Sequence, residues 1–124
     1  MITGIGLDVI ETERVAEKIQ KEQGFRELIF SEEEIAYCEP KTHKYEHYAA
    51  RFAAKEAFFK ALGTGWLEGT LFNEIIILGD EKGKPELQLK GQTAQTLEHI
   101  SLDKIKISLS HLKNIAAAVV IIED

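Results

Sequence analysis

The residues of this chain whose types and spacing could do chemistry lie mainly between positions 55 and 65. Glu56, Lys60 and Gly63 are spaced at i, i+4 and i+7, so they share one face of a predicted helix. That face ends at Gly63-Thr64-Gly65, a turn that can bring backbone N–H groups close to a phosphate. Spacing alone favours two simpler interpretations: an exposed ion pair worth about 0.3–0.5 kcal/mol, and an ordinary helix C-terminus.

Asp8 is the second acidic residue to consider, because its segment is otherwise apolar or glycine. An exposed strand end or a helix N-cap would explain it equally well, but a buried carboxylate without a partner is costly. If Asp8 and Glu56 converge, they need a cation, and two hard oxygen ligands with open positions suit Mg²⁺ bound to phosphates. Lys55 and Lys60 would then supply fixed positive charge for phosphoryl transfer. These four side chains are therefore the candidates for a magnesium and phosphate site.

A strand at residues 2–10 and a helix at about 42–62 must bring these side chains together. Four residues share one face of the strand: Ile2, Gly4, Gly6 and Asp8. The two glycines leave a notch on that face, where a helix or a ligand can approach closely. Five alanines make the helix thin before Gly63 closes it: Ala50, Ala53, Ala54, Ala57 and Ala61. A thin helix packed on the notched strand would place Asp8 beside Glu56.

The remaining elements are predicted from local patterns. Residues 11–22 have helical character, and Ser31 with Glu34 matches a capping box that opens a short helix through about Cys38. We predict four further strands and one further helix: strands at about 72–78, 86–90, 105–111 and 115–122, and a helix at 92–100. Residues 112–114 join the last two strands as a hairpin. Residues 1–124 are therefore expected to form one α+β domain.

Composition and charge exclude several classes of protein. The chain is 44% hydrophobic and 29% charged, which is ordinary for a globular domain. Its net charge of −6 and the lack of a basic run argue against a nucleic-acid partner. Cys38 is the single cysteine, which excludes an internal disulfide and favours a reducing cytoplasm. We expect no signal peptide and no membrane partner, because the longest apolar run is far below the roughly 20 residues that span a bilayer.

Three blocks of the sequence resemble one known family. They are Gly4-Ile5-Gly6-Leu7-Asp8, then Arg51-Phe52-Ala53-Ala54-Lys55-Glu56-Ala57 continued by Phe58-Phe59-Lys60-Ala61-Leu62-Gly63-Thr64-Gly65, and Ser108-Leu109-Ser110-His111. These blocks resemble the holo-acyl-carrier-protein synthases, the small trimeric class of the 4′-phosphopantetheinyl transferase superfamily. The resemblance covers nearly the whole chain. It implies an α+β fold in which a small antiparallel sheet packs on a long central helix.

The resemblance also implies an activity and a set of site residues. It implies transfer of 4′-phosphopantetheine from coenzyme A to a serine of an apo acyl carrier protein, leaving adenosine 3′,5′-bisphosphate, in support of fatty acid biosynthesis. Asp8 and Glu56 would be the Mg²⁺ ligands, and with Lys60 they would form the catalytic group. The residues around the coenzyme A phosphates and nucleotide would be Lys55, Lys60, Gly63, Thr64, Gly65 and His111.

Partners follow from the same resemblance. It implies a cytoplasmic homotrimer with active sites at the subunit interfaces, and the strand at 115–122, apolar on both faces, is expected near the subunit contacts. An acidic carrier would dock on the first helix through Arg14, Lys18 and Lys21. Position 28 is leucine, where family members often have arginine.

Other functions remain open at this point. A transferase serving secondary-metabolite synthases would typically be about twice this length with two fused halves. A catalytically silent subunit would have no physical need for Asp8, Glu56 and Lys60, whereas a Mg²⁺-dependent phosphate-ester hydrolase could use the same residues. His43 and His47 would share a helix face, but no third zinc ligand has a suitable spacing, so a solvated polar face is favoured.

Overall fold

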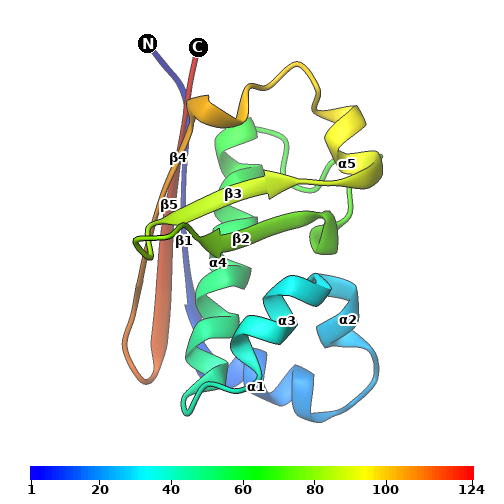
Figure 1. The fold of residues 1–124 in the computed structure, drawn as a ribbon, viewed down its shortest axis with the longest axis vertical. Coiled ribbons are helices and arrows are strands. Elements are labelled where there is room, and N and C mark those ends of the chain that lie inside the picture. The colour runs from blue at the N-terminus through cyan, green and yellow to red at the C-terminus, as the bar shows by residue number, and fades with distance from the viewer.

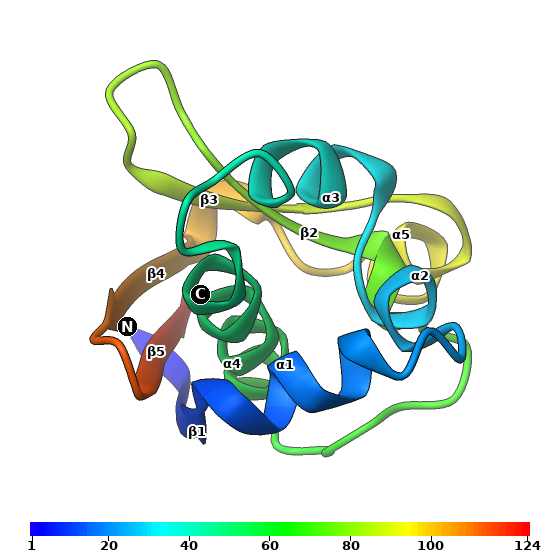
Figure 2. The ribbon, with the colours of Figure 1, turned by 90° about the horizontal axis from the view of Figure 1, so that it is seen from below.

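Helix α4 (Lys44–Leu62) runs through the middle of the molecule, and the other elements lie around it (Figures 1 and 2). The computed structural model describes all residues from Met1 to Asp124. The helix ends where it was predicted to end: Gly63 has a φ of 80°, and its N–H bonds to the carbonyl oxygens of Phe59 and Lys60. None of the helices combines the length and the apolar character needed to cross a bilayer.

A three-stranded antiparallel sheet covers one side of α4. Its order is β1 (Ile2–Glu11), β5 (Ile115–Glu123) and β4 (Ile105–His111), so the first and last strands of the chain lie side by side (Figure 1). Strands β4 and β5 form the predicted hairpin. Alternate residues of β5 are buried against the helix: Ala116, Ala118, Val120 and Ile122. The predicted fold class, a small antiparallel sheet packed on a long helix, is confirmed.

Gly4 and Gly6 allow β1 to lie closer to α4 than any side chain would permit. A Cβ atom on Gly4 would lie 2.1 Å from the carbonyl oxygen of Ala61, and one on Gly6 would lie 1.9 Å from that of Ala57. The predicted notch is therefore confirmed, and the backbone of the thin helix fills it. Because Asp8 follows Gly6 on the same face of the strand, this contact brings its carboxylate to the helix.

The remaining elements cover the other sides of α4 (Figure 2). They are α1 (Thr12–Gln20), α2 (Phe25–Ile29), α3 (Glu32–Cys38), β2 (Ile75–Gly79), β3 (Pro85–Leu89), α5 (Gly91–Thr96) and the 3₁₀ turns Phe72–Glu74 and Leu102–Lys104. Strands β2 and β3 pair with each other only, as a second sheet. The predicted capping box of α3 is confirmed.

Several elements differ from the sequence-based prediction. The strand predicted from Phe72 begins only at Ile75, because Phe72–Glu74 form a 3₁₀ turn. Helix α2 was not predicted, because five residues are too few to display a helical period. Helix α1 also ends at Gln20, before the predicted residue 22.

Candidate functional site

Asp8 and Lys60 meet where β1 crosses the last turns of α4. The Lys60 ammonium donates to the Asp8 carboxylate oxygen Oδ1 at 3.0 Å and to the Leu7 carbonyl oxygen at 2.9 Å. The Asp8 side chain is largely buried, whereas about half of the Lys60 side chain is exposed. The other Asp8 oxygen, Oδ2, is buried and has no hydrogen-bond partner. An acceptor in this state is costly unless a cation or a donor reaches it.

Glu56 lies one helical turn before Lys60 and faces the same carboxylate. Burial raises the pKa of Glu56, and the negative charge of Asp8 raises it further. The two acidic groups are therefore close enough to repel each other. No group of three or more His, Cys, Asp or Glu side chains could enclose a metal ion. Two carboxylates with an unpartnered oxygen suit Mg²⁺, which commonly uses one or two carboxylates and fills its remaining positions with water and phosphate oxygens.

The Gly63-Thr64-Gly65 turn follows directly on this face of α4. Gly63 and Gly65 have positive φ angles of 80° and 64°, and all three residues are exposed. The N–H groups of Gly63 and Thr64 bond back to carbonyl oxygens of the helix, as in an ordinary C-terminus. Those two amides are therefore not free for a phosphate. What the turn offers is an open surface beside Lys60 from which a ligand could approach.

Lys55 does not lie with the other candidates. None of its side chain is exposed, and its ammonium donates to the Glu34 carboxylate and to two backbone carbonyl oxygens. Burial lowers its pKa to about 8, and the charge of Glu34 opposes that shift. A phosphate could reach this ammonium only if the surrounding helices separated. In this structure Lys55 therefore lies apart from the exposed surface beside Lys60, where the coenzyme A phosphates are expected.

His111 lies on the opposite edge of the sheet from Asp8, with the central strand β5 between them. Asp8 pairs with Ala118 of the central strand, and His111 belongs to the other edge strand, β4. Its ring nitrogen Nδ1 lies 2.9 Å from the Glu46 carboxylate. It borders a cavity of about 760 Å³, whose other polar lining residues include His47, Arg51, Asp80, Lys84 and Ser108. Within one copy of the chain, His111 therefore lies apart from Asp8, Glu56 and Lys60.

The basic residues of the first helix are exposed. Arg14 and Lys18 project from α1, and Lys21 follows its last residue. The nearby Arg26 is less available, because its guanidinium is paired with Glu27 and Glu39. Leu28, on the short helix α2, is 65% exposed. This surface combines exposed cations with one apolar side chain.

Comparisons with known proteins agree with this geometry. The sequence profile of the 4′-phosphopantetheinyl transferase superfamily matches residues 4–120. This chain belongs to that superfamily. The holo-[acyl-carrier-protein] synthase of Cytophaga hutchinsonii is 46% identical over 123 residues, which cover 98% of this chain and 97% of the relative.

Solved structures of transferases with the same name are similar over the full length. The crystal structure of the Neisseria meningitidis holo-[acyl-carrier-protein] synthase superimposes with a TM-score of 0.89 at 35% identity, covering all of both chains. The Bacillus anthracis synthase in complex with CoA (3′,5′-ADP) has a TM-score of 0.79 at 35% identity, covering 99% of this chain and 97% of that one.

Arg51 lines the cavity of this transferase beside His111, but we predicted no role for it from the sequence. Its side chain is 6% exposed and borders the cavity beside His111. Its Nε donates to the Ile77 carbonyl oxygen at 3.0 Å, and its guanidinium lies over the Tyr37 ring at 4.4 Å. A signal was present in the sequence, because Arg51 opens the central resembling block one helical turn before Lys55.

Proposed function

We propose that this chain transfers 4′-phosphopantetheine from coenzyme A to a serine hydroxyl of an apo acyl carrier protein. The serine hydroxyl would give its proton to a water held by a nearby carboxylate, and its oxygen would bond to the β-phosphorus of coenzyme A. The bond from that phosphorus to the bridging oxygen would break, and adenosine 3′,5′-bisphosphate would leave. The observation that carries this proposal is the unpartnered Asp8 oxygen beside Glu56 and Lys60, in a member of this superfamily. We further propose that residues 1–124 form one domain. We also propose that the protein acts in a reducing cytoplasm.

Asp8 and Glu56 are the residues that would hold Mg²⁺. The bound ion would offset the charge of the coenzyme A pyrophosphate. Lys60 orients Asp8 through the 3.0 Å contact and has an exposed side chain beside the Gly63-Thr64-Gly65 turn. Its ammonium is therefore the group of this chain that would offset charge developing on the leaving phosphate.

We also propose that the active site is shared between the copies of a homotrimer. Two observations support this assembly. His111 and its cavity lie on the opposite edge of the sheet from Asp8, so a ligand as long as coenzyme A could join the two regions across neighbouring copies. In addition, the face of β1 that points away from α4 exposes three large apolar side chains: Ile5 at 64%, Leu7 at 60% and Val9 at 55%. Such a patch marks an interaction surface.

Val119 tests the proposed assembly, because it belongs to the same outer face of the sheet and pairs with Leu7. Val119→Lys should convert the assembly to monomers in light scattering and abolish transfer. Val120 would be a poor choice, because it faces α4 and is fully buried. A wild-type protein that is an active monomer at assay concentration would contradict the shared site.

The proposed activity is tested by incubating the protein with coenzyme A and Mg²⁺, with and without apo carrier protein. Mass spectrometry should show a carrier heavier by one 4′-phosphopantetheine, with adenosine 3′,5′-bisphosphate released only when the carrier is present. Breakdown of coenzyme A without carrier would instead identify a hydrolase. If neither reaction occurs, the chain is a silent binding module.

A further inference from the structure

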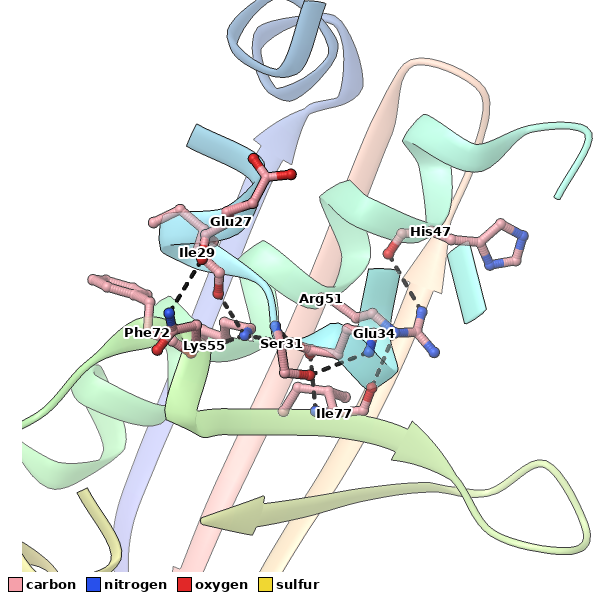
Figure 3. Close-up of polar contacts among 10 residues, drawn as sticks. Glu27, Ile29, Ser31, Glu34, His47, Arg51, Lys55, Phe72 and Ile77 are labelled. Carbon is pink, nitrogen blue, oxygen red and sulfur yellow. Dashed lines mark hydrogen bonds and ion pairs between the residues drawn. The ribbon is translucent and has the colours of Figure 1, made fainter. Parts of the chain in front are cut away.

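Glu34 and Lys55 form a buried ion pair that no step of the proposed transfer uses. We propose that this pair is a positioning device, which holds the segment α2–α3 in a fixed position against the helix that carries Glu56. Figure 3 shows the pair and its partners. The inference rests on the proposed function, because the segment it holds adjoins the surface proposed to meet the carrier.

All three N–H groups of the Lys55 ammonium donate hydrogen bonds within the molecule. It donates to Glu34 Oε1 at 2.6 Å, to the Ile29 carbonyl oxygen at 2.7 Å and to the Phe72 carbonyl oxygen at 2.9 Å. An ammonium has three donors, so none remains. Ile29 is the last residue of α2, and its carbonyl has no partner within so short a helix. Lys55 therefore anchors the end of α2 to α4, 26 residues further along the chain.

Glu34 is equally occupied. Its Oε1 also accepts the Ser31 N–H of the capping box, and its Oε2 accepts the Ile77 N–H, both at 3.0 Å. Ile77 lies in β2, whose edge on this side has no neighbouring strand. Arg51 binds the carbonyl oxygen of the same residue. A capping-box glutamate needs only the Ser31 contact, so the other two bonds join α3 to the second sheet and to α4 (Figure 3).

Stability alone does not account for such a pair. Both side chains have an exposed fraction of 0%, and removing two charges from water cancels most of their attraction. Apolar residues of similar volume often stabilise a core equally well. What the pair adds is directed bonds to four backbone groups in three separate segments. A shifted α3 would leave two buried charges unpaired, and a shifted α2 would take the Ile29 carbonyl oxygen away from the buried Lys55 ammonium. The pair therefore disfavours displaced arrangements of both helices.

The position of Lys55 connects this device to the reaction. Lys55 and Glu56 are consecutive on α4, so their side chains point about 100° apart around the helix axis. Lys55 reaches toward α2, and Glu56 reaches toward Asp8 on β1. The pair therefore sets where the exposed surface of α2, including Leu28, lies relative to the two carboxylates. Losing it should misplace the carrier and leave the binding of coenzyme A unchanged.

The test compares a charge-free variant of the pair with a matched surface control. Glu34→Gln with Lys55→Met removes the buried pair and leaves no uncompensated charge. Glu33→Gln with Lys90→Met removes the same charges from an exposed pair that also joins α3 to the second sheet. We expect the first variant to raise KM for the carrier about tenfold or more and to change the Kd for coenzyme A by less than about twofold. The control should change neither constant.

Amide hydrogen exchange supplies a second measurement, made on the wild type and on the charge-free variant. A five-residue helix is too short to be stable by itself, so protection of its amides must come from its anchors. In the wild type, the Leu28 and Phe30 amides of this segment should exchange about a hundredfold or more slowly than in a free peptide, and the charge-free variant should lose that protection.

Each outcome decides the inference. Unprotected α2 amides in the wild type, or a folded charge-free variant whose KM for the carrier is unchanged, would overturn it. Equal changes in the constants for carrier and coenzyme A would overturn it as well, because they indicate general destabilisation. A wild type without any transfer would refute the proposed function instead, and the exchange data would then decide the role of the pair alone.

Discussion

Gly6→Ala should be among the most damaging single-methyl additions possible in this chain. The added Cβ would lie 1.9 Å from the Ala57 carbonyl oxygen and 2.7 Å from the Ala61 backbone nitrogen. Both atoms belong to the backbone of α4, so no flexible side chain can yield. The strand itself must move away from the helix.

The required movement sets the magnitude. Ordinary contacts of a Cβ atom begin near 3.4 Å, so the strand must retreat by about 1.5 Å at this point. Overpacking of a core usually costs about 1–3 kcal/mol, and a backbone-to-backbone clash belongs at or above the upper end of that range. We expect a loss of at least about 3 kcal/mol, a large part of the roughly 5–15 kcal/mol that stabilises a typical domain. Asp8 would move with the strand, so transfer should fall as well.

Urea unfolding followed by circular dichroism measures this loss at a fixed protein concentration. Gly79→Ala is the matched control, because its Cβ would meet its nearest atoms at an ordinary 3.4 Å and Gly79 does not have a positive φ. The control should change the free energy of unfolding by less than about 0.5 kcal/mol. A Gly6→Ala loss below about 1 kcal/mol with an unchanged m value would refute the close approach of β1 and α4.

Three further predictions concern the metal, the carrier and the thiol. Glu56→Gln should abolish most Mg²⁺-dependent transfer with an unchanged circular dichroism spectrum; a wild-type rate would remove Glu56 from the site. Reversing the charges of Arg14, Lys18 and Lys21 should raise KM for an acidic carrier only, and salt should weaken wild-type docking, because exposed charges are screened within about 10 Å at 0.1 M. Equal effects on coenzyme A would exclude a carrier-specific surface. Burial raises the pKa of the Cys38 thiol to about 12, so iodoacetamide at about pH 8 should label it only after unfolding. Rapid labelling of the native protein would contradict that burial.

Local signals in the sequence determined most of the element boundaries. Gly63 ends α4 because only a residue that tolerates a positive φ closes a helix in this way, and that requirement is visible without a structure. The capping box of Ser31 and Glu34 is equally local, since its partners lie three residues apart. The glycine alternation of β1 even predicted which face meets the helix. Helix α2 escaped prediction because its five residues depend on contacts with distant segments.

The site was predictable only in part. The sequence predicts that Asp8 and Glu56 lie close together, because the strand period places Asp8 on the face of the two glycines and the helix period places Glu56 on the face of Lys60. The sequence identifies Lys55 as a cation on α4, but its burial depends on Ile29, Glu34 and Phe72, which approach it from other parts of the chain. The separation of His111 from Asp8 depends on strand order, which places β5 between them. Both facts arise from long-range packing, and no local pattern encodes which segment will cover a given face.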